Sequence, residues 1–136
     1  MVAHACGVYP EECCGIMLGT NSGPGKLVQQ VLLLENVTLR GRRARYEVRP
    51  DDLLQAQKLA EKEGLVLSGV YHSHPDGDTS FSHTDLENSC PWYSFVVLSI
   101  RGGRFDSAAA WLPNAGQTSA EKEELIYPQQ TQLRGD

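Results

Sequence analysis

The apolar residues of the first fifty positions fall in short, strand-sized stretches. Two of these stretches, at 15–19 and 26–35, are separated by turn-forming residues and predict a hairpin of two strands. A further strand-like piece at 44–48 leads into Pro50, where proline stops the strand. Asp51 follows directly and is suited to cap a helix that begins there.

A helical pattern replaces the strand pattern after this point. Five apolar residues recur at a spacing that places them on one face of a helix: Leu53, Leu54, Ala56, Leu59 and Ala60. Gly64 is a natural terminator of this helix. The apolar, partly β-branched stretch at 65–71 then predicts a central strand buried on both faces, and this strand leads directly into His72.

The second half of the chain predicts a short helix over 82–90 and a β-hairpin formed by 94–100 and 105–112. From Pro113 onward the chain is mostly polar and predicts either an added edge strand or a frayed end. The pattern as a whole indicates an α/β or α+β fold, with a mixed sheet flanked by one long helix and one or two short ones. A length of 136 residues favours a single domain over 1–136, with a polar tail from about residue 114.

Charge and composition narrow the function classes. The chain has 12 Lys and Arg against 17 Asp and Glu, a net charge of −5, which argues against a general nucleic-acid binder or a protein of anionic membrane surfaces. No apolar run reaches the roughly 18 residues of a membrane span, and the first residues do not form a signal peptide, so we expect a cytoplasmic protein. The four cysteines form no C-x-x-C pair and are expected to be reduced thiols.

One cluster of basic residues stands out on this acidic chain. It consists of Arg40, Arg42, Arg43, Arg45 and Arg49. A charge run of this kind is often a solvated face of a loop or strand. The alternative is a docking patch for an acidic partner or for a C-terminal carboxylate.

The stretch that follows the central strand carries the candidate chemistry. His72 and His74 are two residues apart in extended chain, so their imidazoles project to the same side and can converge on one ion. Asp85 lies about one helical turn after Ser82 and can bring a carboxylate to the same point. Two imidazoles and one carboxylate leave a fourth tetrahedral position open, as in a catalytic zinc site.

Each part of this stretch also has a structural interpretation. Histidines near a strand end are often surface or core residues, and Ser82-x-x-Asp85 has the form of a helix capping box. The two roles are compatible, because a cap fixes the direction in which Asp85 points. A base near the metal would come from Glu11 or Glu12, although both can equally be solvated loop acids.

A family resemblance rests on these residues. The string His72-x-His74-Pro75, six further residues and Ser82-x-x-Asp85 resembles the full JAMM signature of the MPN-type (JAB) metallopeptidases. The segment 10–19 resembles the P-x-E-x-C-G element of the same family, and its register selects Glu12 rather than Glu11. The similarity extends over roughly residues 3–112 and implies a cytidine-deaminase-like mixed sheet of the JAMM/MPN type.

The resemblance also implies roles for individual residues. His72, His74 and Asp85 would hold Zn²⁺, and Glu12 would act first as general base and then as general acid. Ser82 would donate a hydrogen bond to the oxyanion, although its hydroxyl is less free to do so if it caps the helix. Two neighbours have no such role, because Ser73 is expected on the opposite face of the strand and His83 in solvent. Cys14 is expected to be a core residue.

Family members with an intact signature are zinc-dependent peptidases or isopeptidases of ubiquitin-like proteins, and they often cut after a C-terminal Gly-Gly. Short bacterial members are associated with sulfur-carrier proteins of the ubiquitin fold. We therefore expect a partner of this kind, with its Gly-rich tail bound as an added strand. The alternatives are a non-catalytic MPN-type scaffold, which usually lacks metal ligands, and a DNA-associated relative similar to the RadC proteins, which the charge of −5 does not favour.

Overall fold

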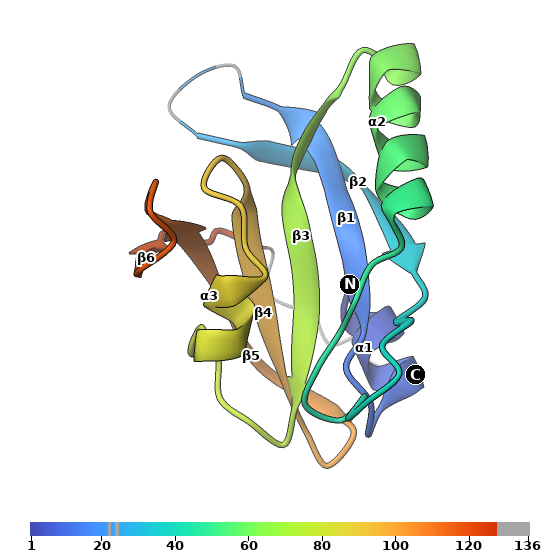
Figure 1. Ribbon diagram of the computed structural model, residues 1–136, viewed down its shortest axis with the longest axis vertical. Helices are drawn as coiled ribbons and strands as arrows, with labels where there is room; N and C mark the ends of the chain where they lie inside the picture. Colours follow the sequence, from blue (N-terminus) through green and yellow to red (C-terminus); the bar gives the residue numbers. More distant parts are fainter. Residues whose placement is uncertain (22, 24, 128–136) are drawn as a thin grey trace, which may run out of the picture.

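A six-stranded mixed sheet forms the centre of the protein (Figure 1). The computed structural model describes residues 1–21, 23 and 25–127. Strand order across the sheet is β2-β1-β3-β4-β5-β6, and among these strands only β3 and β4 pair in parallel. The strands are β1 (Cys14–Thr20), β2 (Leu27–Leu34), β3 (Val66–Pro75), β4 (Ser94–Arg101), β5 (Arg104–Pro113) and β6 (Ala120–Glu123).

Three helices cover the two faces of this sheet. They are α1 (Val2–Val8), α2 (Pro50–Glu63) and α3 (His83–Glu87). In Figure 1, α2 and α3 lie in front of the sheet and α1 lies behind it. The core is accordingly divided into two clusters: Met17 and Tyr71 pack with Ala5 of α1, whereas Ile16 and Leu18 pack with α2. The mixed fold expected from the apolar pattern is therefore confirmed.

The long helix ends where the sequence predicts but is capped differently. Gly64 takes a left-handed conformation with φ 68° and closes the helix, as expected. The N-cap, however, is Arg49, and Asp51 lies inside the first turn, so the expected cap at Asp51 is wrong. Pro50 explains the difference, because its fixed φ and missing N–H suit the first helical position.

The strand expected at 44–48 is also wrong, because these residues form an irregular segment between β2 and α2. Their peptide groups bind the side chain of Asn36 instead of a neighbouring strand. The remaining strands and the short helix appear near their expected positions. The polar segment after Pro113 adds β6 as an edge strand, and the part of the predicted tail beyond residue 127 lies outside the described residues.

Close packing between β3 and its neighbours sets the position of the site. A Cβ on Gly69 would lie 1.8 Å from the carbonyl oxygen of Ser94, so glycine is required where β3 approaches β4. Along the same strand, His72 pairs with Cys14 of β1 and with Val97 of β4. Within the described part of the chain, no helix has the length and apolar character needed to cross a membrane.

Candidate metal centre

The C-terminal end of β3 carries both histidines of the predicted metal site. His72 is completely buried and His74 is nearly so, and their Nε2 atoms are 3.1 Å apart. His74 Nδ1 is 2.8 Å from the backbone oxygen of Asp78. A proton on Nδ1 makes this hydrogen bond and leaves the Nε2 lone pair free to face His72.

Asp85 completes a triad with the two imidazoles. Its Oδ1 lies 3.1 Å from His72 Nε2, and its Oδ2 lies 3.0 Å from His74 Nε2. The capping box of α3 fixes this placement: Ser82 Oγ accepts from the Asp85 N–H, and Asp85 Oδ2 accepts from the Ser82 N–H, both at 3.0 Å. Asp85 thus takes part in the capping box and also lies next to both histidines.

The three side chains strongly affect one another's pKa. Burial alone would raise the pKa of the Asp85 carboxyl, but its contacts with His72 and His74 outweigh burial and hold it well below the ordinary value. Burial lowers the pKa of His72. For His74 burial acts in the same direction, but the hydrogen bond and the charge of Asp85 prevail and the pKa is raised. The arrangement therefore favours an ionised carboxylate beside a neutral His72.

Glu12 lies beside this triad, just before β1 begins. Its side chain is only 4% exposed, and Oε1 has no hydrogen-bond partner among the described residues. Desolvation raises the pKa of the Glu12 carboxyl to about 8, against the opposing charge of His74. One ligand atom from each of Glu12, His72 and His74 lies within 4.8 Å of the other two. Glu12, and not Glu11, is the acid that the fold brings to the histidines.

The backbone after Glu12 is held by Ser73, on the opposite face of β3 from the histidines. Ser73 Oγ accepts a 2.8 Å hydrogen bond from the Cys13 N–H, and the Ser73 N–H donates to the Cys13 carbonyl at 3.2 Å. Ser73 is fully buried. The expectation that it supports the sheet and does not face the metal site is confirmed.

The Ser82 hydroxyl can still donate a hydrogen bond while it caps α3. The bond from the Asp85 N–H uses a lone pair of Oγ, so the O–H proton remains available as a donor. Ser82 is also exposed. The competition between capping and oxyanion binding that the sequence suggested is therefore absent in this geometry.

Aromatic residues surround the site in a way that the sequence did not indicate. The Tyr46 ring stacks on His72 with centroids 4.5 Å apart and an interplanar angle of 25°. The Phe81 ring lies 6.5 Å from His72, centroid to centroid, and stacks on Trp111, whose Nε1 donates to the Thr79 carbonyl at 2.8 Å. These contacts fix the loop between His74 and Ser82. The one sequence signal for a role of Tyr46 was its aromatic side chain in the segment shortly before α2.

A groove of about 600 Å³ lies beside Tyr46, on the face of the sheet that carries the histidines. One wall is the segment 45–50, and the other is formed by Asn88, Cys90 and Tyr93 after α3. The floor is apolar and includes Val70 and Phe95. Because Tyr46 both lines this groove and stacks on His72, the groove adjoins the candidate metal centre.

Several other titratable residues lie away from this centre. His83 is largely exposed, as expected, and its Nε2 lies 2.9 Å from Glu87 Oε1. His4 Nδ1 is 2.9 Å from the Tyr71 hydroxyl, behind the sheet. The four cysteines are free thiols, with Cys13 and Cys14 buried.

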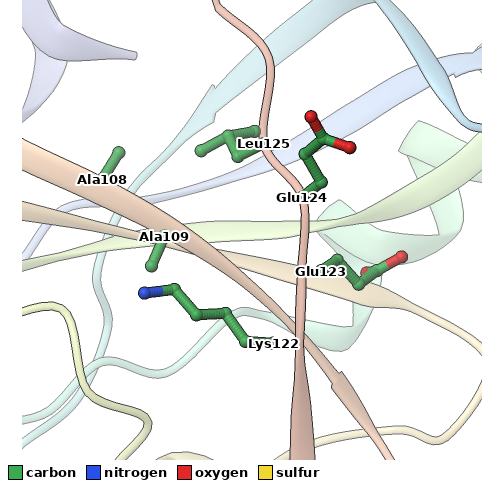
Figure 2. A pocket seen from close by; sticks show the side chains of 6 residues that line it. All are labelled: Ala108, Ala109, Lys122, Glu123, Glu124 and Leu125. Atoms are coloured by element: carbon green, nitrogen blue, oxygen red, sulfur yellow. The ribbon is translucent and has the colours of Figure 1, made fainter.

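A second pocket, of about 350 Å³, lies between β5 and the end of β6 and contains none of the site residues. Figure 2 shows that the Lys122 ammonium and the Glu124 carboxylate in this pocket point apart, so they form no cluster for a ligand.

The donor set of the centre fits a divalent metal ion. Two imidazole nitrogens and a carboxylate converge at about 3 Å, and Glu12 Oε1 is buried without a partner. Among the described residues, no Lys or Arg forms an ion pair with Asp85 or Glu12. Buried carboxylates are costly unless they are paired or coordinate a metal, and a cation at this point would satisfy both.

Comparison with known proteins agrees with this fold and donor set. Residues 1–112 match the model of the Prok-JAB family, the prokaryotic homologs of the JAB domain. The protein therefore belongs to the Prok-JAB family.

Two curated relatives are each 33% identical to this chain. One is the desampylase of Haloferax volcanii, aligned over 72% of this chain and 69% of its own length. The other is a probable TtuB-protein conjugate cleaving protease of Thermus thermophilus, aligned over 75% of this chain and 65% of its own length.

Two solution structures share the fold. A protein from Salinibacter ruber has a TM-score of 0.70 and 35% identity, and the match covers 94% of this chain and 85% of that one. A protein from Desulfitobacterium hafniense has a TM-score of 0.79 and 27% identity, and the match covers 91% and 83% of the two chains.

Proposed function

We propose that this protein is a zinc-dependent peptidase or isopeptidase that cuts at the C-terminus of a ubiquitin-like or sulfur-carrier protein. The observation that carries the proposal is the buried Glu12 carboxyl, whose Oε1 has no hydrogen-bond partner within residues 1–21, 23 and 25–127. It lies beside two histidines and an aspartate that converge on one point. A purely structural cluster gives no reason for an unpaired acid at this place.

His72, His74 and Asp85 would hold the zinc ion. A zinc ion with three such ligands lowers the pKa of a water molecule to about 7 and polarises a carbonyl group. The hydrogen bond from His74 to the Asp78 backbone and the capping box of α3 orient two of the three ligands before metal binds.

Glu12 would move the proton. A general base works best when its pKa is near the working pH. Burial raises the pKa of Glu12 to about 8 in the metal-free protein, and a cation beside the carboxyl would lower it from that value. Oε1 can accept a proton from the attacking water and return it to the leaving amine. Ser82 would use its free O–H to donate to the substrate carbonyl oxygen as negative charge develops there.

The groove beside Tyr46 suits an extended peptide tail. Its apolar floor and its backbone wall at 45–50 resemble the surroundings of an added strand. Glycine residues at the scissile end would pass the crowded metal site, because they carry no side chain. Arg45 and Arg49 lie in the groove wall, but Arg49 is paired with Glu35 at 2.8 Å. Arg45 is therefore the member of the basic cluster in this wall that can meet an acidic or carboxylate-bearing partner.

The names of the two curated relatives, a desampylase and a probable TtuB-protein conjugate cleaving protease, support this substrate class. The test is a cleavage assay with a carrier protein fused through a C-terminal Gly-Gly, combined with elemental analysis for zinc. We expect the wild-type protein to contain zinc and to cut the fusion, and Glu12→Gln to keep the zinc and lose the activity. A zinc-free protein, or cleavage by Glu12→Gln at the wild-type rate, would refute the proposal.

The same assay separates the alternatives. Binding of the carrier without any cleavage by zinc-loaded wild-type protein would identify a scaffold, and preferential binding of DNA would identify a RadC-like role. The basic cluster is tested separately by neutralising Arg42, Arg43 and Arg45 together. Carrier binding should weaken at low salt, and an unchanged affinity would exclude the cluster as a docking patch.

A further inference from the structure

Asn36 lies in the segment that follows β2, and its side chain makes four hydrogen bonds to backbone groups. Its Nδ2 donates to the carbonyl oxygens of Glu12, at 3.1 Å, and Arg45, at 2.9 Å. Its Oδ1 accepts from the N–H groups of Thr38, at 3.2 Å, and Glu47, at 3.0 Å. An amide side chain has two donor hydrogens and two acceptor lone pairs, so every one of them is used.

The partners of Asn36 are not a random set of loop groups. The Arg45 carbonyl and the Glu47 N–H belong to the peptide units on either side of Tyr46. Tyr46 is the ring that stacks on His72. The Glu12 carbonyl belongs to the residue that supplies the buried acid. One amide therefore fixes the backbone of the acid and the backbone of the aromatic residue that packs on a metal ligand.

Further hydrogen bonds hold the backbone around Glu12. The Glu12 N–H donates to the Arg42 carbonyl at 2.7 Å, and the following residue is bound to Ser73. Arg42 belongs to the same segment between β2 and α2 as Asn36, so this segment holds both peptide groups of Glu12. A rotated Asn36 amide would place donors against donors and acceptors against acceptors, so only one orientation satisfies all four contacts.

We infer that Asn36 is a positioning residue that keeps Glu12 and Tyr46 in place beside the proposed metal ligands. The inference rests on the proposed function in so far as Glu12 and His72 take part in catalysis. Asn36 touches neither the metal ligands nor the reacting atoms and acts through the two residues it holds. Because the wall at 45–50 also lines the groove, the same amide connects the tail-binding surface with the proposed base.

The test uses Asn36→Asp, which keeps the shape and the acceptors but replaces the two donated hydrogen bonds by repulsion from the Glu12 and Arg45 carbonyls. Asn114→Asp is the matched control. Asn114 also holds a turn by hydrogen bonds, from the N–H groups of Thr118 and Ser119 and to the Thr118 hydroxyl, but it lies between β5 and β6 and contacts no site residue. Asn36→Ser supplies a milder variant if Asn36→Asp does not fold.

The first readout needs no activity. In metal-free protein the stacked Tyr46 ring shifts the imidazole proton resonances of His72, and the Cys13 amide resonance reports on the Glu12 carbonyl in the same peptide unit. Both signals should move in the Asn36 variant and stay in place in Asn114→Asp. Unchanged His72 and Cys13 resonances in a folded Asn36 variant would overturn the inference, whether or not the protein proves to be a peptidase.

The second readout is the kinetics of zinc-loaded protein on the carrier fusion, at a temperature where all variants are folded. We expect kcat to fall at least tenfold in the Asn36 variant and to remain within twofold of wild type in Asn114→Asp, with equal zinc content. Displaced resonances with an unchanged kcat would reduce Asn36 to a structural residue, whereas a wild-type protein that cuts nothing would refute the proposed function alone.

Discussion

Glu12→Gln should remove a pH dependence from the stability of the metal-free protein. The wild-type carboxyl is buried and its Oε1 has no partner, so the folded state favours the protonated acid. Its pKa is about 8 in the folded protein and 4.5 as the ordinary value. An acid whose folded pKa is raised stabilises the fold fully below its unfolded pKa, and the stabilisation is lost as the pH rises toward the folded pKa.

The size of the effect follows from these two values. One pKa unit corresponds to about 1.4 kcal/mol, so the span from 4.5 to about 8 amounts to roughly 5 kcal/mol. A pH of 7 lies about 2.5 units above the ordinary pKa and still below the folded pKa. About 3 kcal/mol of the stabilisation is therefore lost at pH 7. The same loss is absent in Glu12→Gln, because glutamine carries no titrating group. His72 and His74 also titrate, but both are present in the two proteins, so their contributions largely cancel in the difference.

The assay is denaturant unfolding in the presence of a chelator, repeated between about pH 5 and pH 8. The difference in unfolding free energy, wild type minus Glu12→Gln, should fall by about 3.5 kcal/mol over this range. Glu11→Gln is the matched control, since it removes the same charge one residue away and leaves the buried carboxyl in place. Parallel curves for wild type and Glu12→Gln would refute the account of an unpaired, desolvated acid.

Three further predictions follow from single contacts. Asp85→Asn should lower zinc affinity at least tenfold by isothermal titration, because a neutral amide replaces the carboxylate between His72 and His74. The control His83→Ala should bind zinc as wild type does. Equal affinities in all three proteins would place the metal elsewhere. Ser73→Ala should cost roughly 1–3 kcal/mol in denaturant unfolding, since the buried Cys13 N–H loses its partner, and an unaltered midpoint would contradict this. Gly69→Ala should lower the unfolding free energy by at least about 2 kcal/mol, because the new Cβ would meet the Ser94 carbonyl; a variant as stable as wild type would show that β3 and β4 can separate there.

The sequence predicted those parts of the fold that local patterns determine. The apolar stretches that became β1, β3 and β4 are nearly continuous, because these strands are buried on both faces. Gly64 and the Ser82-x-x-Asp85 box also act within a few residues of chain, and both were predicted correctly. The strand expected at 44–48 failed for the opposite reason, since its backbone partners come from Asn36 and not from a repeating ladder.

The same distinction applies to the site. The convergence of His72, His74 and Asp85 follows from strand geometry and a helix cap, so the spacing was sufficient to predict it. The register of Glu12 came from the family resemblance, because position alone did not separate it from Glu11. The stacking of Tyr46 on His72 and the tie from Trp111 to Thr79 join residues far apart in the chain, and no local pattern records them.

The origin of the site residues from different segments bears on how such a protein can change over evolutionary time. All three proposed ligands lie on one continuous stretch from the end of β3 through the first turn of α3, whereas Glu12 arrives on a separate segment before β1. The proposed roles in metal binding and proton transfer can therefore be inherited or lost independently. Under the proposed function, a single substitution at Glu12 would leave a folded protein with its three proposed ligands and its groove intact, which has the properties needed for a binding protein to arise from a peptidase.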